Sequence, residues 1–380
     1  MSEAMRIGLF TYGMNDKLTG IGRYAMQLSY AMRKAASDVE IVLINPYPHS
    51  PLTWYQDFPV VSVPSLQRLP AVMVWGPIAL ERIAARHHLD ILHDPCGIAP
   101  FLPTQAVRRV VTIHDAIPLI YPQLNPWLGR LVFHTGVPWS RSTTAKVITD
   151  SLSAQADLAE YARIPKSHIM VIYPGVDVLD PDEVTSLRQA ACPPGLLESM
   201  GEPYFLYVGA INPRKNVARI IEAVKMLQEQ YGRTRLIIVG PDKPSGIPVN
   251  SDVVQYIGYV DQKTLDFLYV HASAVLVPSL YEGFGFPALE AMARHTVAIV
   301  SNVSSLPEVT RDGAMHVDPH STKAWVTAMH SVLIDQELRE GMARRGYSVA
   351  QTFTWEKAAR DTIALYRQVL SEKPTREALS

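Results

Sequence analysis

Short apolar segments recur along this chain and alternate with longer stretches of helical periodicity. The segments of the first half are residues 6–10, 40–44, 90–93, 109–113, 146–149 and 169–172, and those of the second half are residues 204–208, 236–239, 254–257, 274–277 and 297–300. Such alternation is typical of parallel sheets that helices cover on both faces. The chain of 380 residues is long enough for two domains, each with its own core. The sequence therefore predicts an α/β protein with two parallel-sheet domains.

The composition argues against several classes of protein. A formal net charge of -1 is unlike the basic excess of nucleic-acid-binding domains. Cys96 and Cys192 are too few for a disulfide framework, and no signal-peptide pattern opens the chain. No apolar run is long enough to span a bilayer. We therefore expect a cytoplasmic protein.

A glycine-containing loop follows the apolar segment 274–277 and precedes a run of helix formers. Gly283 and Gly285 allow close approach of the backbone to a ligand, and Pro287 suits the first turn of a helix. Glu282 and Glu290 place a carboxylate at each end of this loop. The pattern fits a site where amides meet phosphate and carboxylates meet sugar hydroxyls. It also fits an ordinary turn between strand and helix, with Glu282 as a cap and Glu290 in solvent.

The segment from Glu282 to Glu290, Glu-Gly-Phe-Gly-Phe-Pro-Ala-Leu-Glu, resembles the E-x7-E signature of retaining glycosyltransferases of group 1, family 4, which use nucleotide sugars. Residues 207–216, 301–308 and 313–319 are similar to further segments of that family in the same order. The resemblance implies the GT-B fold, in which two Rossmann-like domains face each other across a deep cleft. It implies an acceptor domain at residues 1–178, a donor domain at 179–354 and a final helix at 355–380 that crosses back to the first domain.

The resemblance also implies the roles of residues in the second half. Arg214 and Lys215 match the cations that bind the donor diphosphate, Glu282 matches the contact to the transferred sugar, and Glu290 matches the contact to the ribose. The remaining donor-binding candidates lie in two glycine loops of this half, and they are Gly209, Gly283, Phe284, Gly285 and Phe286.

The first half contains a second glycine pattern. Gly20, Gly22 and Ala25 match the dinucleotide fingerprint G-x-G-x-x-G/A, which raises the alternative of a nicotinamide enzyme. Gly20 comes well after the first strand ends, and the second predicted strand is followed by Asn45 rather than an acid, so this alternative is disfavoured. By resemblance, Gly20 and Gly22 belong to the donor site, and the amide of Gly22 approaches the diphosphate.

His114 and Asp115 follow the predicted strand 109–113, where ligands of parallel sheets bind. By resemblance they match a His-Asp pair near the transferred sugar, so we include both among the catalytic candidates with Arg214, Lys215 and Glu282. His93 ends another predicted strand. A structural role, with its ring hydrogen-bonded in the core, is the alternative for each histidine.

A metal site is a further alternative, because His87, His88, His93, Asp94 and Cys96 are crowded together. Their spacing fits no zinc pattern, since adjacent residues of a helix point apart. Cations and amides can balance the charge of a leaving diphosphate, so we expect neither a metal nor a cofactor.

The predicted activity is metal-independent transfer of a hexose, with retention, from a nucleotide sugar to a glycan or lipid-linked acceptor. Pro213-Arg-Lys-Asn216 resembles mannosyltransferase-like members, which favours GDP-mannose, and a UDP-sugar is the alternative donor. Ala210 and Arg294-His295 depart from the family pattern, so a nucleotide-sugar-binding protein without transferase activity is a third hypothesis. Residues 65–86 and 125–146 mix tryptophan and aliphatic residues with basic ones, which suits peripheral contact with the inner face of a membrane through the N-terminal domain. A core-facing helix whose charges are solvated is the alternative for each stretch.

Overall fold

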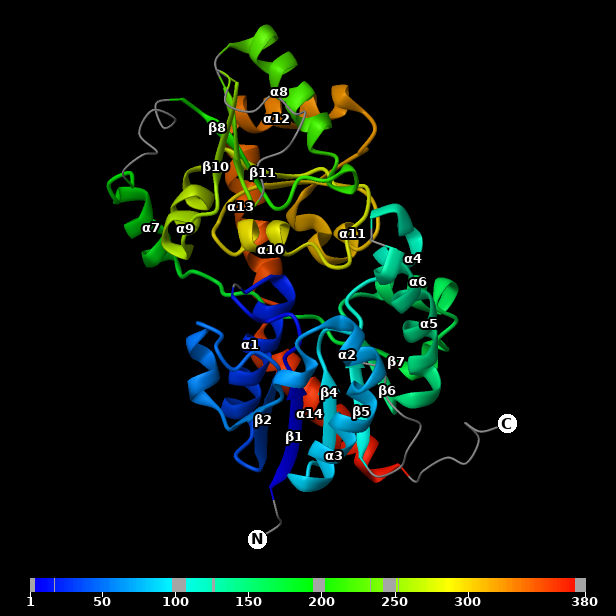
Figure 1. Cartoon of the computed structure of the whole chain (residues 1–380). Coiled ribbons are helices and arrows are strands. Elements are labelled where there is room, and N and C mark those ends of the chain that lie inside the picture. Colours follow the sequence, from blue (N-terminus) through cyan, green and yellow to red (C-terminus); the bar gives the residue numbers. More distant parts are fainter. Residues whose placement is uncertain are drawn as a thin grey trace. The chain divides into compact units, whose positions relative to one another are not determined.

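The computed structural model describes residues 4–16, 18–97, 107–124, 127–193, 202–232, 234–241, 251 and 253–372. The chain divides into two compact units (Figure 1). Unit 1 contains Met1–Gly175 and Thr354–Ser380, and unit 2 contains Val176–Phe353. Unit 1 is therefore built from both ends of the chain, whereas unit 2 is continuous in sequence.

The sheet of unit 1, within the described residues, has seven parallel strands in the order β3-β2-β1-β4-β5-β6-β7. The strands are β1 Met5–Phe10, β2 Val39–Asn45, β3 Val60–Ser62, β4 Ile91–Asp94, β5 Arg108–Thr112, β6 Lys146–Thr149 and β7 Ile169–Val171. The helices are α1 Gly20–Ala35, α2 Leu69–Val74, α3 Gly76–Arg86, α4 Ile117–Ile120, α5 Trp127–Thr143, α6 Leu152–Tyr161 and α14 Trp355–Ser371. Short 3-10 turns are η1 Thr53–Asp57, η2 Pro64–Leu66, η3 Pro122–Leu124 and η4 Lys166–His168.

Both faces of this sheet are buried, which explains why its strands are almost continuously apolar. Successive side chains of a strand point to opposite faces. In β2, Ile41 and Leu43 belong to a core cluster with residues of α1 and α14, whereas Val42 and Ile44 belong to a cluster with residues of α3 and α6. Helix α14 therefore completes one of the two hydrophobic layers of unit 1.

The sheet of unit 2 has six parallel strands among the described residues, in the order β10-β9-β8-β11-β12-β13. The strands are β8 Tyr204–Val208, β9 Arg235–Val239, β10 Val254–Gly258, β11 Ala274–Val277, β12 Ala298–Ser301 and β13 Met315–Val317. The helices are α7 Pro181–Gln189, α8 Val217–Tyr231, α9 Gln262–His271, α10 Phe286–Met292, α11 Leu306–Thr310, α12 Thr322–Ile334 and α13 Gln336–Ala350, with 3-10 turns η6 Pro213–Lys215 and η7 Arg311–Gly313. Helices α8 and α12 pack on one face of the sheet, where Phe205, Ile220 and Trp325 share a core cluster.

The prediction of two parallel-sheet α/β units is confirmed. Helix α1 begins at Gly20, so the glycine pattern of the first half lies in its first turns. Thr19 sets this start, since its Oγ1 accepts a hydrogen bond from the Gly22 amide at 3.3 Å and caps the helix. Strands β3 and β13 were not predicted. Each has only three residues and includes a polar one, Ser62 in β3 and His316 in β13, so neither forms an apolar run in the sequence.

Candidate functional site

Two loops of unit 2 meet beside the centre of its sheet. Strands β8 and β11 are hydrogen-bonded neighbours, and the chain continues from β8 to one side of the sheet and from β11 to the other. Ligands of such sheets bind beyond the carboxyl ends of the strands at this switch point. Gly209 follows β8 directly and Pro278 follows β11 directly. The Leu280 amide donates to the Arg214 carbonyl at 2.8 Å, which joins the two loops.

Arg214, Lys215 and Glu282 form a compact group of charges, which we call the Glu282 cluster. Lys215 Nζ lies 2.5 Å from Glu282 Oε1, and Arg214 Nη1 lies 3.4 Å from Glu282 Oε2. None of the three side chains is more than 15% exposed. Arg214 also donates to the carbonyl of Tyr281. The structure thus brings together three residues that the sequence had singled out separately.

The Glu282 carboxylate stays ionised in this setting. Burial favours the neutral acid, but the charges of Lys215 and Arg214, with hydrogen bonds from Lys215 and Ser279, lower the pKa of Glu282 below its ordinary value. Ser279 Oγ donates to Glu282 Oε1 at 2.6 Å. Two cations face one carboxylate, so the cluster keeps one net positive charge, which suits an anionic ligand.

Asn216 connects the loops around the cluster. Its backbone is left-handed, with φ 53° and ψ 30°, a conformation that asparagine tolerates better than most residues. Its Nδ2 donates to the carbonyl of Pro278 at 3.1 Å and to that of Pro319 at 2.9 Å. One side chain therefore fixes the start of α8 against the loops after β11 and β13.

Two serines hold the loop that begins at Glu282. Ser304 Oγ accepts from the Glu282 amide at 2.8 Å. Ser305 Oγ lies within hydrogen-bond distance of the carbonyls of Glu282 (2.9 Å) and Phe284 (3.0 Å). Several polar groups of the loop backbone are therefore satisfied inside unit 2, and the loop is held in one conformation.

Gly285 requires its glycine. Its φ of +104° is strained for any residue with a side chain, and a Cβ there would lie 2.7 Å from Leu306 Cδ2. Helix α10 begins at the next residue, Phe286, whose ring meets that of Phe284 edge-on at 5.0 Å between centroids. Gly283, which lies between Glu282 and Phe284 in the sequence, is also buried.

Glu290 lies on α10, half-buried, at the other end of the motif. The hydroxyl of Tyr269, on α9, donates to Glu290 Oε2 at 2.7 Å. Glu290 is therefore not simply a solvated residue of a helix surface.

The remaining candidates belong to unit 1. His114 Nδ1 lies 2.7 Å from Asp150 Oδ2, and His114 Nε2 lies 2.9 Å from the carbonyl of Pro95. Burial lowers the pKa of His114, but the carboxylate of Asp150 and the carbonyl of Pro95 outweigh it, so the pKa lies above its ordinary value. Only the imidazolium can donate to both acceptors. The ring is thus engaged on both sides within unit 1.

The other candidates of unit 1 are Asp115, Gly20, Gly22 and His93. Asp115 Oδ1 accepts from the Ile117 amide at 2.9 Å, which sets the turn before α4. Gly20 opens α1, and the amide of Gly22 donates to Thr19. His93 is fully buried, and burial lowers its pKa to about 3, so it is neutral. Its ring bonds Thr112 Oγ1 at 2.8 Å and the hydroxyl of Tyr366 at 2.6 Å, which supports the structural alternative for His93.

Comparison with known proteins decides the family. A family model described as glycosyl transferases group 1 matches residues 193–349, and one described as glycosyltransferase family 4 matches residues 18–178. Together the two matches span most of the chain. The chain is a group 1 glycosyltransferase.

Relatives and solved structures agree with this assignment. The glycosyltransferase is 27% identical to O-antigen chain mannosyltransferase B of Escherichia coli, over 96% of this chain and 100% of the relative. It is 26% identical to O-antigen chain mannosyltransferase RfbU of Salmonella typhimurium, over 88% and 92%. Sucrose-phosphate synthase of Thermosynechococcus elongatus has the same fold, with a TM-score of 0.75 at 20% identity over 97% and 99%. HepE of Anabaena, solved in complex with UDP-glucose, gives a TM-score of 0.69 at 16% identity over 96% and 100%. The fold is therefore GT-B.

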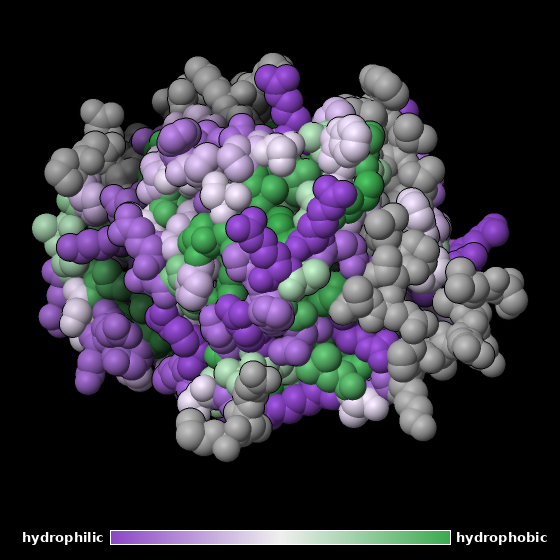
Figure 2. All heavy atoms as spheres, turned by 60° about the horizontal axis from the view of Figure 1, so that its bottom comes forward, coloured by the Kyte–Doolittle hydropathy of each residue, from purple (hydrophilic) through white to green (hydrophobic). Residues whose placement is uncertain are grey.

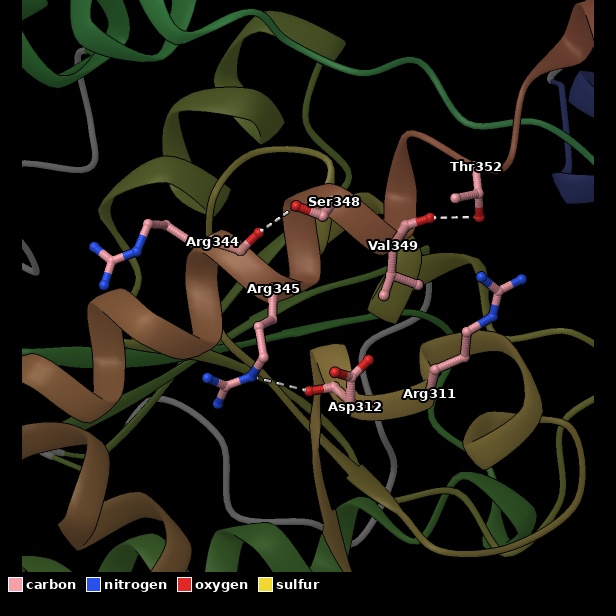
Figure 3. Close-up of a pocket in the computed structure, with 7 residues that line it drawn as sticks. All are labelled: Arg311, Asp312, Arg344, Arg345, Ser348, Val349 and Thr352. Carbon is pink, nitrogen blue, oxygen red and sulfur yellow. Dashed lines mark hydrogen bonds between the residues drawn. The ribbon is translucent and has the colours of Figure 1, made fainter.

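A groove elsewhere in unit 2 of this glycosyltransferase has a volume of about 330 Å³. Its lining residues come from η7 and from α13 and the turn after it, and they are Arg311, Asp312, Arg344, Arg345, Ser348, Val349 and Thr352. Figure 3 shows that the side chains of Arg311 and Arg344 extend away from each other. The guanidinium groups do not converge on one point, and none of these residues was among the predicted site residues.

The two stretches predicted to suit a membrane surface lie in unit 1. In residues 65–86 the glycosyltransferase exposes Val74 and Trp75, at 63% and 64%. The side chains of Trp127, Leu128, Leu131 and Val132, in the second stretch, lie outside the described residues. Figure 2 shows a face on which hydrophobic areas are separated by hydrophilic residues. Among the described residues, no helix has the length and apolar character needed to cross a bilayer.

A metal site was the other alternative. Within the described ranges, no three side chains of histidine, cysteine, aspartate or glutamate are grouped so that they could hold a metal ion. Asp94 Oδ1 accepts from the Cys96 amide at 2.9 Å, and Cys96 Sγ donates to the carbonyl of Tyr12 at 3.0 Å. These two residues of the crowded segment therefore stabilise the turn after β4.

Some residues of the site escaped the sequence analysis. They are Tyr269, Ser279, Ser304 and Ser305, which bond the predicted glutamates or their loop. Ser304 and Ser305 lie in a segment that resembles the family, which was the available signal. Tyr269 lies in no such segment, and only the packing of α9 beside α10 reveals it.

Proposed function

We propose that this glycosyltransferase transfers mannose from GDP-mannose to a glycan or lipid-linked acceptor, with retention of the anomeric configuration and without a metal ion. The Glu282 cluster at the switch point of unit 2 carries this proposal. Both relatives described above are named mannosyltransferases. A UDP-sugar is the second candidate donor, since HepE has the same fold and was solved with UDP-glucose.

The chemistry of the reaction explains the charges of the cluster. When the bond between sugar and diphosphate breaks, negative charge grows on the leaving phosphate, and fixed cations nearby lower the energy of the transition state. One cation at about 4 Å, at an effective dielectric near 20, contributes about 4 kcal/mol before desolvation. Arg214 and Lys215 supply this charge in the proposal, so a metal ion is not needed for it.

In the proposal, the remaining site residues contact different parts of the substrate. The ionised Glu282 accepts hydrogen bonds from hydroxyls of the transferred sugar, and Glu290 accepts them from the ribose. Gly209, Gly283, Phe284, Gly285 and Phe286 surround the nucleotide sugar through their backbone. Gly20, Gly22, His114 and Asp115 are the proposed contribution of unit 1, with the His114 imidazolium as an additional positive charge.

In this proposal the anomeric configuration is retained because the acceptor hydroxyl attacks the anomeric carbon from the same face that the diphosphate leaves. The leaving phosphate accepts the proton of that hydroxyl. A route through a covalent intermediate would need a carboxylate as nucleophile. Both oxygens of Glu282 are already bonded to cations or a hydroxyl, which disfavours it as a nucleophile.

The test of donor and function is binding followed by transfer. Purified protein is heated with GDP, UDP, ADP, their sugar conjugates or NAD, with EDTA present throughout. A ligand at 100 times its dissociation constant adds about 2.7 kcal/mol to the free energy of unfolding. Stabilisation by GDP and GDP-mannose supports the proposal, stabilisation by UDP conjugates changes the donor, and a response to NAD alone refutes both.

Transfer itself is measured with the donor that binds. Release of free or acceptor-linked sugar by the purified chain excludes a protein that only binds nucleotide sugar, and the anomeric configuration of the product is read by NMR. An inverted product would overturn the front-face mechanism. Co-sedimentation with anionic vesicles, before and after Trp75→Ser, tests the proposed peripheral membrane contact.

A further inference from the structure

Tyr269 forms the end of a buried network between α9 and α10. Its ring is 0% exposed, and its hydroxyl donates to Glu290 Oε2 at 2.7 Å. Burial and the negative charge of Glu290 raise the pKa of Tyr269 well above its ordinary value, so the phenol remains protonated and acts as a donor. This hydrogen bond selects one rotation of the Glu290 carboxylate. Oε2 is engaged by the tyrosine, and Oε1 is left to accept a hydrogen bond from another group.

Arg294 holds this tyrosine in place. Arg294 is 4% exposed, and its Nε lies 2.6 Å from Asp266 Oδ1 on α9. Its Nη1 donates to the Glu290 carbonyl at 3.2 Å, and its guanidinium lies 5.3 Å from the centroid of the Tyr269 ring. One arginine thus contacts Asp266 and the Tyr269 ring of α9 and a backbone carbonyl near the end of α10. Arg294 is one of the positions at which the sequence departs from the family pattern.

We propose that Tyr269, held by Arg294, is a positioning residue that orients the Glu290 carboxylate toward the ribose hydroxyls of the donor nucleotide. The inference rests on the proposed function, because it takes Glu290 as the ribose contact. A carboxylate on a half-buried helix surface has several rotations of similar energy. Fixing one of them before the ligand arrives removes an entropic cost of binding.

The experiment compares Tyr269→Phe with the wild-type protein against two ligands. The ligands are GDP and 2′,3′-dideoxy-GDP, with UDP and its dideoxy form as a second pair. The variant keeps the ring and removes the one hydroxyl. We expect the wild type to bind the ribonucleotide about tenfold more tightly than the dideoxy form, and the variant to bind both with similar affinity. This comparison is a double-mutant cycle between a protein hydroxyl and ligand hydroxyls.

Tyr204→Phe is the matched control. Tyr204 is 2% exposed, and its hydroxyl donates to the Leu268 carbonyl of the same helix α9 at 2.8 Å. This control loses a buried hydrogen bond of the same kind without touching Glu290. We expect it to keep the full preference for the ribonucleotide. Thermal unfolding of both variants shows whether each is folded.

The kinetic readout separates positioning from catalysis. Tyr269→Phe should raise the KM for the nucleotide sugar about tenfold and leave kcat within about twofold of the wild type. Equal loss of affinity for the ribo and dideoxy nucleotides would show that the hydroxyl only stabilises the fold, and no loss for either would also overturn the inference. If Glu290→Ala abolishes the ribose preference but Tyr269→Phe does not, the inference alone fails. If the wild type binds none of the four nucleotides, the proposed function fails with it.

Discussion

Lys215 Nζ lies 2.5 Å from Glu282 Oε1, although 67 positions separate the two residues in the sequence. They meet because β8 and β11 are neighbours in the sheet and each strand is followed by one of the two loops. The ion pair is also buried, so removing one partner would leave the charge of the other without its partner. Replacing either residue should therefore affect both the chemistry and the stability of unit 2.

Lys215→Ala should lower kcat by roughly two to three orders of magnitude, as loss of one preorganised charge contact does in other enzymes. The measurement is steady-state turnover with the donor that binds, together with thermal unfolding. Lys323→Ala, which removes an exposed lysine on α12, is the control and should behave as wild type. Near-normal turnover of Lys215→Ala would refute its role.

Glu282→Gln should separate sugar binding from diphosphate binding. The amide no longer attracts Arg214 and Lys215 as a charge, so both cations are freer to bind an anion. We expect GDP or UDP to bind as tightly as to wild type or more tightly, while transfer falls roughly 10- to 100-fold because a charged hydrogen-bond acceptor for the sugar is lost. Calorimetry gives the first quantity and turnover gives the second.

Glu229→Gln, at an exposed position on α8, is the control for charge alone. If Glu282→Gln weakens diphosphate binding as much as it lowers transfer, the carboxylate acts mainly by holding the two cations in place, and its assignment to the sugar hydroxyls is wrong.

Gly285→Ala should destabilise unit 2 by about 2 kcal/mol or more. The new side chain would be strained at φ +104° and would lie 2.7 Å from Leu306 Cδ2. The loop from Glu282 to Phe286 would have to move, so affinity for the donor nucleotide should fall as well. Gly341→Ala on α13 is the control, since its Cβ would meet Arg345 Nη1 at an ordinary 3.5 Å. Unchanged stability of Gly285→Ala would contradict the geometry described for this turn.

His114→Gln should cost more stability in acid than in base. The pKa of His114 is raised above its ordinary value of 6.5 in the folded protein, mainly by Asp150 and Pro95 against the effect of burial. A raised pKa stabilises the folded state fully below the unfolded pKa, and the contribution is lost as the pH rises through the folded pKa. The deficit in melting temperature should therefore shrink by roughly 2–4 °C between about pH 5.5 and about pH 9.

His49→Gln, at an exposed position, is measured alongside and corrects for general effects of pH. A deficit for His114→Gln that stays constant across this range would mean that the ring is not protonated in the folded protein.

The sequence was sufficient for the class of fold, and it singled out Arg214, Lys215 and Glu282 as candidates before their contacts were known. Strands such as residues 274–277 are buried on both faces, so every residue of the strand is apolar and the run can be recognised in the sequence. The contacts could not be predicted, because they depend on which strands become neighbours. The pairing of Lys215 with Glu282 is one example, and the hydrogen bond from Tyr269 to Glu290 is another.

Helix starts and edge strands were harder to predict from the sequence, because they depend on single local contacts and on exposure. Thr19 moves the start of α1 to Gly20 through one side-chain hydrogen bond, which an apolar periodicity does not record. Val60 in β3 is 43% exposed, so this edge strand has no inward-facing pattern that could reveal it.

Helix α14 belongs to unit 1 but is translated after the whole of unit 2. Tyr366 bonds His93 across 273 positions, and Ala359, Ile363 and Val369 of the same helix complete the core above β1 and β2. A ribosome makes the first 175 residues of unit 1 early, yet that core lacks one of its layers until the final helix emerges. Unit 2 is encoded without interruption and has its whole sequence available sooner. The half of the enzyme that is translated first is therefore the half that must wait longest to finish folding, with one hydrophobic surface of its sheet uncovered in the meantime.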